Sequence, residues 1–330
     1  MPEIESGAAL GSRSDFLTSL LPCFLSFLSF RGLRSFPASL PVDASRLFAG
    51  SSLLRSRPSL HFKIPPILTL APSQPHVAKS LRLVQFSDPH LFGTADGALR
   101  GVATLPALKA TMAHAERYFR CPDALLLTGD LVQDDPGGYA LLRATFESSK
   151  VPVYCLAGNH DVPEKMNATL QGAPFQVGGR FIDAGWLVVM LDTWKAKSTG
   201  GRLGKSQLSN LEATLAGHPD LHVLLCLHHH PVAMDSRWLD KVGLDDAAEF
   251  LALIARFPQV RGVLWGHVHQ SLDRFLNGVR FMASPATCAQ FLPRSADFAL
   301  DWRPPGYRVL ELLADGTIAT EVVWVENTAP

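Results

Sequence analysis

Apolar and polar stretches alternate along the chain from about Leu81 onwards, in a pattern typical of strands joined by helices. Short, mainly apolar runs predict buried strands at Leu83–Phe86, Ala124–Leu127, Val153–Leu156, Leu187–Leu191, His222–Leu227 and Gly262–Trp265. Apolar residues spaced three and four apart predict amphipathic helices at Ala103–Phe119, Gly138–Phe146, Lys205–Leu215 and Asp245–Phe257. After Trp265, Asn277-Gly278 and Asp315-Gly316 favour tight turns, so we expect an antiparallel end to the fold.

Residues 1–80 show neither pattern and are rich in Ser, Pro, Leu, Phe and Arg. The apolar stretch Phe16–Phe30 contains Pro22 and several serines, and it is shorter than the ~20 residues that span a bilayer. A signal-peptide core is the alternative, but no convincing small-residue cleavage site follows it. We therefore expect a disordered or spurious extension over residues 1–80, a folded domain over residues 81–330, and no stable membrane insertion.

Composition narrows the class of protein. The chain has 330 residues, of which 47% are hydrophobic and 18% charged, so it can bury the core of one large domain or two modest ones. Lys plus Arg and Asp plus Glu both number 30, which gives no basic surface for nucleic acid. The five cysteines are odd in number and lack a C-x-x-C pair, which argues against a disulfide framework or a thiolate zinc site. We expect reduced thiols in a cytoplasmic protein.

Polar clusters follow the predicted strands directly, where ligands bind in open α/β sheets. The five clusters are Ser87-Asp88-Pro89-His90, Gly129-Asp130, Gly158-Asn159-His160-Asp161, His228-His229-His230-Pro231 and Gly266-His267-Val268-His269. Their donors are oxygen and imidazole nitrogen, without a thiolate. That mixture suits Fe, Mn or Zn and argues against copper(I) or an iron–sulfur cluster.

The spacing within the clusters suits a pair of divalent cations. Two cations about 3.5–4 Å apart need a bridging carboxylate, and Asp130 is the candidate. Because side chains alternate along an extended strand end, Asp88 and His90 are expected on the same side, as are the two histidines of Gly-His-x-His. Asn159 would add a neutral carbonyl oxygen.

Each motif has an ordinary explanation when it is taken alone. An Asp-x-His pair is common by chance, Gly-Asp is usually a turn, and three adjacent histidines could form a solvated cluster. These explanations do not account for five polar motifs that each follow a predicted strand, and the histidine triplet follows an apolar strand. The set as a whole therefore favours one shared metal site.

The ordered set D-x-H, G-D, G-N-H-D, H and G-H-x-H resembles the calcineurin-like metallophosphoesterase superfamily from about residue 81 to the C-terminus. Four further stretches are similar to the bacterial class III 3',5'-cyclic AMP phosphodiesterases: Leu227–Pro231, Trp238-Leu239-Asp240, Phe257–Gln270 and Ser284–Phe291. The resemblance implies an α/β fold, a four-layer metallophosphoesterase sandwich of two mixed β-sheets flanked by helices. Residues 81–330 would then be the metallophosphoesterase domain.

The resemblance also implies a set of site residues. One metal would bind Asp88, His90, Asp130 and His269, and the second would bind Asp130, Asn159, His228 and His267. The two ions would be Fe, Mn or Zn, including a mixed Fe/Mn pair. His160 would contact the phosphate or protonate the leaving oxygen, with Asp161 orienting it. The expected substrate contacts are His90, Asp130, Asn159, His160 and His269, while His229 and His230 are left to ligand support or packing.

We therefore expect a hydroxide bridging the two metals to attack phosphorus in line and to open 3',5'-cyclic AMP to 5'-AMP. One alternative is a phosphoesterase for 2',3'-cyclic nucleotides, other diesters or monoesters. Another is a non-catalytic binding module on the same fold. Ser284–Gln290 and Trp238 either line the nucleotide pocket or serve the core and its loops, and a homodimer is possible.

Overall fold

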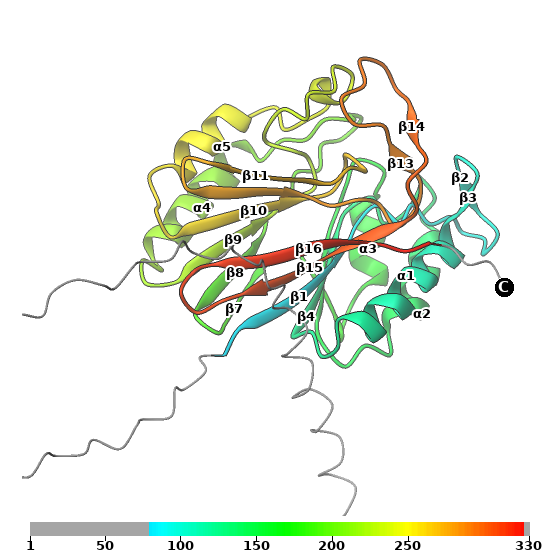
Figure 1. Ribbon diagram of the computed structural model, residues 1–330, viewed down its shortest axis with the longest axis horizontal. Coiled ribbons are helices and arrows are strands. Elements are labelled where there is room, and N and C mark those ends of the chain that lie inside the picture. The colour runs from blue at the N-terminus through cyan, green and yellow to red at the C-terminus, as the bar shows by residue number, and fades with distance from the viewer. Residues whose placement is uncertain (1–78, 327–330) are drawn as a thin grey trace, which may run out of the picture. The chain divides into compact units, whose positions relative to one another are not determined.

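A computed structural model describes residues 79–326 and is built around two six-stranded sheets (Figure 1). The first sheet has the order β16 (Ile318–Trp324), β15 (Gly306–Leu312), β1 (Leu81–Phe86), β4 (Ala124–Thr128), β5 (Val153–Leu156) and β6 (Phe175–Val177). The second has the order β11 (Leu272–Leu276), β12 (Val279–Ala283), β10 (Val260–Trp265), β9 (His222–Cys226), β8 (Trp186–Met190) and β7 (Arg180–Asp183). Two small hairpins accompany them, β2 (Ala98–Leu99) with β3 (Val102–Ala103) and β13 (Gln290–Phe291) with β14 (Leu300–Asp301).

Both large sheets are mixed. In the first, β1, β4, β5 and β6 run parallel, while β15 and β16 continue it in antiparallel pairing. In the second, β8, β9, β10 and β12 run parallel, with β7 and β11 antiparallel at the two edges. The carboxyl ends of neighbouring parallel strands lie at one edge of their sheet, which is where a ligand site is expected.

Three apolar cores separate four layers. Between the sheets, β1, β4 and β15 of the first pack against β8, β9 and β10 of the second. On its other face the first sheet packs against α1 (Thr104–Tyr118), α2 (Gly138–Phe146) and α3 (Pro163–Thr169). The second sheet packs against α4 (Gly204–Ala216), α5 (Ala247–Ile254) and the short 3-10 helix η3 (Leu239–Lys241). This arrangement confirms the predicted α/β sandwich.

The predicted elements correspond closely to those of the structure. The six predicted strands are β1, β4, β5, β8, β9 and β10, and the four predicted helices are α1, α2, α4 and α5. Both predicted hairpins are present, as β11–β12 and β15–β16. The expectation of an antiparallel end was wrong in one respect, because β12 also pairs in parallel with β10. The hairpin thus adds a buried strand to the parallel sheet rather than a separate antiparallel unit.

The remaining expectations concern cysteines and the chain ends. Cys155, Cys226 and Cys288 are free and buried, as expected, whereas Cys121 is disulfide-bonded and departs from that expectation. Within residues 79–326, none of the helices combines the length and the apolar character needed to cross a bilayer. The extension predicted over residues 1–80 lies outside the described residues except for Lys79 and Ser80.

Candidate metal centre

The loops that follow β1, β4, β5, β9 and β10 carry the seven predicted donors, and the six other than Asn159 lie in contact with one another. Six of them are buried, namely Asp88, His90, Asp130, His228, His267 and His269, and Asn159 is half-buried. Asp88, His90, Asp130 and Asn159 follow strands of the first sheet, and the other three follow strands of the second. The centre is therefore assembled between the carboxyl ends of two sheets.

Donor atoms lie close enough to share ions. His90 Nε2 and His269 Nε2 are 3.0 Å apart, and His269 Nε2 is 3.5 Å from Asp88 Oδ1. Asp130 Oδ2 lies 3.7 Å from His90 Nε2 and 3.3 Å from His228 Nε2. Asp130 thus contacts donors of both predicted ion positions, as a bridging carboxylate must.

The hydrogen bonds of three histidines assign the ring nitrogen that remains for a metal. His228 donates from Nδ1 to the Thr128 carbonyl at 2.7 Å, and His269 donates from Nδ1 to the Ala289 carbonyl at 2.7 Å. Both rings therefore present Nε2 to the centre. The His267 ring has the reverse arrangement. Its Nε2 donates to the Val242 carbonyl at 3.0 Å, so Nδ1 is the nitrogen that remains for a metal. Fixing the outer nitrogen in this way is usual for metal-binding histidines.

The donor set fits a pair of divalent cations. His228 Nε2 and Asn159 Oδ1 are buried without a hydrogen-bond partner among the described residues, which is costly unless something binds them. The groups around His228 are carboxylates and imidazoles, the donors expected for Fe, Mn or Zn. The residues present therefore suit the metals that the sequence predicts.

Backbone strain is concentrated at the same residues. Five predicted ligands have φ between 47° and 67°, in the left-handed region that L-residues rarely adopt: Asp88, His90, Asp130, His267 and His269. Such conformations cost energy and persist where the surrounding structure holds them, typically at functional sites. The strained backbone therefore favours a ligand-positioning role for these strand ends.

Electrostatics keep both carboxylates charged. Burial alone would raise the pKa of Asp130, but the imidazoles of His228 and His90 hold it well below its usual range. The His269 imidazole likewise outweighs burial and lowers the pKa of Asp88. Against the effect of burial, the Asp130 carboxylate raises the pKa of His228 to about 9. Two buried anions side by side create a strong local preference for cations.

His160 lies at the rim of this centre. Its backbone N–H donates to Asp130 Oδ1 at 2.8 Å, and its ring is 5.2 Å from the His90 ring between centroids. Ring atom Nδ1 is 2.9 Å from Asp134 Oδ2 and 3.1 Å from Gln133 Nε2. The side chain is partly exposed, so a substrate can reach it.

The expectation that Asp161 orients His160 is not met. The Asp161 carboxylate is buried and accepts hydrogen bonds from Tyr139 Oη at 2.7 Å, Gly158 N at 2.8 Å and Leu131 N at 3.1 Å. Burial, together with Asp130, raises the pKa of Asp161 to about 7. Asp161 therefore braces the two ligand loops, and the carboxylate beside the His160 ring is Asp134. The sequence signal for Asp134 was its place four residues after Asp130 in the same loop.

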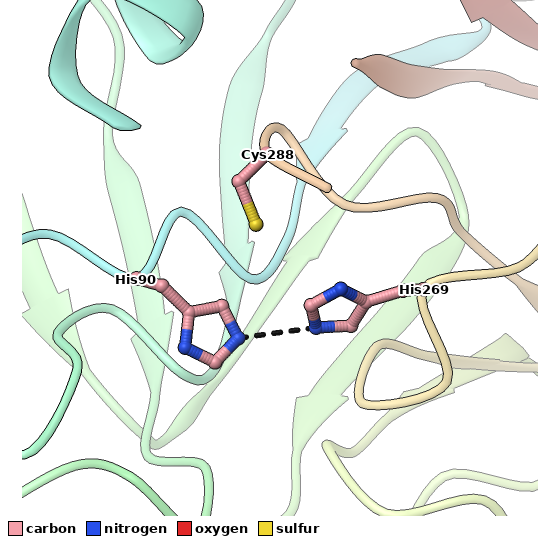
Figure 2. Close-up of side chains that lie close together, drawn as sticks. All are labelled: His90, His269 and Cys288. Carbon is pink, nitrogen blue, oxygen red and sulfur yellow. Dashed lines mark hydrogen bonds between the residues drawn. The ribbon is translucent and has the colours of Figure 1, made fainter. Parts of the chain in front are cut away.

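Sequence reasoning also missed Cys288. Figure 2 shows its thiol beside the rings of His90 and His269, and the potential donor atoms of the three residues lie within 4.8 Å of one another. The Sγ atom donates to the Asp88 carbonyl at 3.1 Å. Burial raises the pKa of the thiol, so Cys288 acts here as a protonated donor that supports the Asp88 backbone.

The two histidines after His228 pack around the ligands. His229 Nδ1 is 2.8 Å from Thr193 Oγ1, and the His229 ring is 4.6 Å from that of His267. The His230 ring stacks on His267 at 5.6 Å and 19°. Both are buried, and a possible donor atom of His229 lies within 4.8 Å of donor atoms of His228 and His267.

Comparisons with solved structures agree with this fold. A dimetal phosphatase from Danio rerio superposes with a TM-score of 0.53 at 14% identity, covering 74% of this chain and 99% of that one. A purple acid phosphatase from yellow lupin gives a TM-score of 0.51 at 14% identity, covering 75% and 54%. At such low identity these likenesses show the fold alone, a sandwich of two mixed sheets flanked by helices.

The family follows from sequence. Residues 81–271 match the calcineurin-like phosphoesterase model, and the chain belongs to that family. The 3',5'-cyclic adenosine monophosphate phosphodiesterase CpdA of Escherichia coli K12 is 40% identical over 250 residues, covering 75% of this chain and 91% of that protein. The Pseudomonas aeruginosa CpdA is 36% identical over 77% and 93%. A 3',5'-cyclic-nucleotide phosphodiesterase from Nostoc is 34% identical over 76% and 94%.

Proposed function

We propose that this protein hydrolyses 3',5'-cyclic AMP to 5'-AMP at a dinuclear metal centre. The observation that carries the proposal is the position of Asp130, whose Oδ2 lies 3.7 Å from His90 Nε2 and 3.3 Å from His228 Nε2, between two groups of donors. The choice of substrate is supported by relatives named as 3',5'-cyclic AMP phosphodiesterases at 36–40% identity.

The residues that would hold the metals divide into two groups that share Asp130. The first is Asp88, His90, Asp130 and His269, and the second is Asp130, Asn159, His228 and His267. When bound, two divalent ions, Fe, Mn or Zn, supply Lewis-acid charge neutralisation at the phosphate and an activated water as nucleophile. Asp88 and Asp130 contribute the negative charge that retains such ions, and His90, Asn159 and His269 face the phosphate.

His160 is the proposed proton donor. Contact with Asp134 at Nδ1 fixes one side of the ring and leaves Nε2 for the substrate. During hydrolysis a P–O bond forms to the attacking water oxygen and the P–O3' bond breaks. The O3' leaving oxygen then takes a proton, which His160 is placed to give. We assign Asp161 to bracing the loops that carry Asp130 and Asn159.

We assign the activity to residues 81–330 and to the cytoplasm. The cyclic nucleotide is the expected partner, and nucleic acid is not. A homodimer stays an open prediction. The second candidate function is hydrolysis of another phosphoester, because a metal centre of this kind contacts the phosphate more than the rest of the substrate. A non-catalytic binding module is disfavoured, since all seven expected donors are present.

A substrate panel tests the proposal. The full chain and residues 81–330, each loaded with Mn, are assayed against 3',5'-cyclic AMP, 2',3'-cyclic AMP, a simple diester and a monoester. We expect 3',5'-cyclic AMP to be turned over best by both proteins. Negligible turnover of it beside strong turnover of another ester would refute the choice of substrate.

Two variants test the dinuclear centre. Asp130→Ala and Asn159→Ala are each expected to abolish hydrolysis and to reduce the bound metal per chain. Gln171→Ala, an exposed change on the loop between α3 and β6, serves as the control for handling and folding. Activity that survives both ligand substitutions would defeat the two-metal mechanism.

A further inference from the structure

Three aromatic side chains form a wall beside the metal centre. They are Trp238, from the loop between β9 and α5, Phe291 of β13, and Phe298, from the loop between β13 and β14. Each pair of rings packs edge to face, with centroids 5.2–5.3 Å apart and interplanar angles of 69–77°. We call these three residues the aromatic wall.

The wall is joined directly to a predicted metal ligand. The Phe291 ring stacks on the His269 imidazole with centroids 4.0 Å apart and planes within 5° of parallel. The backbone N–H of Phe291 also donates to the His269 carbonyl at 3.2 Å. The aromatic wall therefore begins directly at His269.

The outer end of the wall is available to a ligand. Phe298 is 44% exposed, whereas the rings of a folded core are usually covered. The guanidinium of Arg100, between β2 and β3, lies over one face of the Phe298 ring, 5.0 Å from its centroid. Aromatic rings and arginine side chains together are what proteins that bind single-stranded nucleic acid use to stack bases, because every base presents a π-face.

We propose that the aromatic wall binds the nucleobase of the cyclic nucleotide, with Phe298 as the stacking residue that determines specificity. This inference rests on the proposed function. In a 3',5'-cyclic nucleotide a single ribose separates base from phosphate, so a phosphate at the metals leaves the base near the wall. Stacking depends on ring area, so the wall favours purine over pyrimidine cyclic nucleotides.

Phe298→Ala tests the inference when the Mn-loaded full chain is assayed with 3',5'-cyclic AMP and with ribose 3',5'-cyclic phosphate, which lacks a base. Loss of one stacking side chain should lower the ratio of kcat/KM for cyclic AMP to that for the base-free diester by roughly tenfold. The loss should appear in KM. Phe298→Trp, which keeps an aromatic surface, should restore the ratio.

The matched control is Trp302→Ala. Trp302 follows β14 and is 90% exposed, so its removal tests a large aromatic of the same region that lies outside the wall. We expect this variant to keep the wild-type ratio. An equal fall in the ratio for Phe298→Ala and Trp302→Ala would overturn the specific role of the wall.

The outcomes separate this inference from the proposed function. If wild type prefers cyclic AMP and Phe298→Ala keeps the wild-type ratio of kcat/KM values, the base-binding role of the aromatic wall is overturned, while the proposed function stands. If wild type hydrolyses the base-free diester and not cyclic AMP, both fail. If Phe298→Ala instead converts a dimer to a monomer in solution without changing the ratio, the exposed ring is a contact with a second copy, and the base-binding role is overturned.

Discussion

At the residue scale, Gly158 shows how an absent side chain makes room for the centre. A Cβ atom there would lie 2.3 Å from Asp130 Oδ1 and 2.5 Å from His228 Nε2, closer than real Cβ contacts allow. Both neighbours are predicted ligands whose backbone or ring is already held by other contacts. A methyl group at this position must therefore displace at least one donor.

We expect Gly158→Ala to lower metal affinity by roughly 10- to 100-fold, the effect typical of disturbing the support of metal ligands. Bound Mn measured per chain across a range of free Mn gives the affinity, and the Mn dependence of hydrolysis gives an independent value. Gly217→Ala is the control, because Gly217 ends α4 with φ of −75° and its Cβ would come no closer than 3.3 Å to another atom. Equal Mn affinity in Gly158→Ala and wild type would contradict the argument.

Asp161 has a different role, because its carboxylate holds the loops after β4 and β5 together and is not a predicted metal ligand. Removing its carboxylate leaves the N–H groups of Gly158 and Leu131 buried without their acceptor, so we expect Asp161→Ala to lower the free energy of unfolding by about 3 kcal/mol. Tyr139→Phe removes two other hydrogen bonds, the one donated to Asp161 and the one accepted from the Val162 N–H at 2.9 Å, and should cost about 1–2 kcal/mol. Denaturant unfolding measures both. A catalytic role alone would instead leave Asp161→Ala as stable as wild type.

At the element scale, a buried polar network joins the two sheets beneath the centre. Arg308 of β15 donates to the carbonyls of Ala283 at 2.7 Å and Leu272 at 3.0 Å. It also donates to the hydroxyl of Ser284 at 3.3 Å, and Ser284 in turn donates to Gln85 of β1. The chain of contacts continues from Gln85 to Thr128 Oγ1 at 2.8 Å and from Thr128 to Ser87 at 2.7 Å, next to Asp88.

Arg308→Met should destabilise the protein by about 3 kcal/mol, because two buried carbonyls lose their charged donor and no side chain of the variant replaces it. The network ends beside Asp88, so Mn affinity should fall as well. Arg256→Met is the control, because this exposed arginine pairs with exposed Glu212 and solvent screens that ion pair. Similar losses of unfolding free energy in the two variants would show that Arg308 has no special role.

The pattern of apolar residues was sufficient for the main elements and insufficient for the small ones. Six strands and four helices were predicted because each buries several apolar side chains against a sheet face. Helix α3 has seven residues and buries only Met166 in its own span, which leaves little periodicity to detect. The parallel pairing of β12 with β10 depends on a long-range contact between strands, and local turn residues do not encode it.

The site was predictable to the extent that its residues follow strands. Polar residues at strand ends led to all seven predicted donors, since parallel strands bring their carboxyl ends together. Residues that reach the centre from elsewhere gave no such signal. Cys288 lies in the loop after β12, and Phe291 stacks on His269 from the small hairpin. Their positions depend on tertiary packing, as does the hydrogen bonding that gives Asp161 a bracing role.

At the scale of the whole molecule, the centre is a link between the two sheets. Asp88, Asp130 and Asn159 follow strands of the first sheet, and His228 and His267 follow strands of the second. The direct contacts between these groups place imidazoles beside carboxylates, as in the 3.3 Å approach of His228 to Asp130. Bound cations would therefore hold the sheets together at one edge, where the ligand backbones are strained.

Removing the metals should weaken the whole fold, because a ligand that binds only the native state stabilises it by mass action. At free Mn about 100 times its Kd the gain is about 2.7 kcal/mol, which corresponds to a rise in Tm of roughly 5–10 °C for a domain of this size. Chelation followed by Mn titration, monitored by thermal unfolding, measures the rise. In Asp130→Ala the bridge between the two sheets is lost and Mn should leave Tm nearly unchanged. An equal rise in that variant would show that the stabilising ion binds elsewhere. The proposed centre can hold the two sheets together only through ligands that come from both sheets, and Asp130 is the ligand that the two groups share.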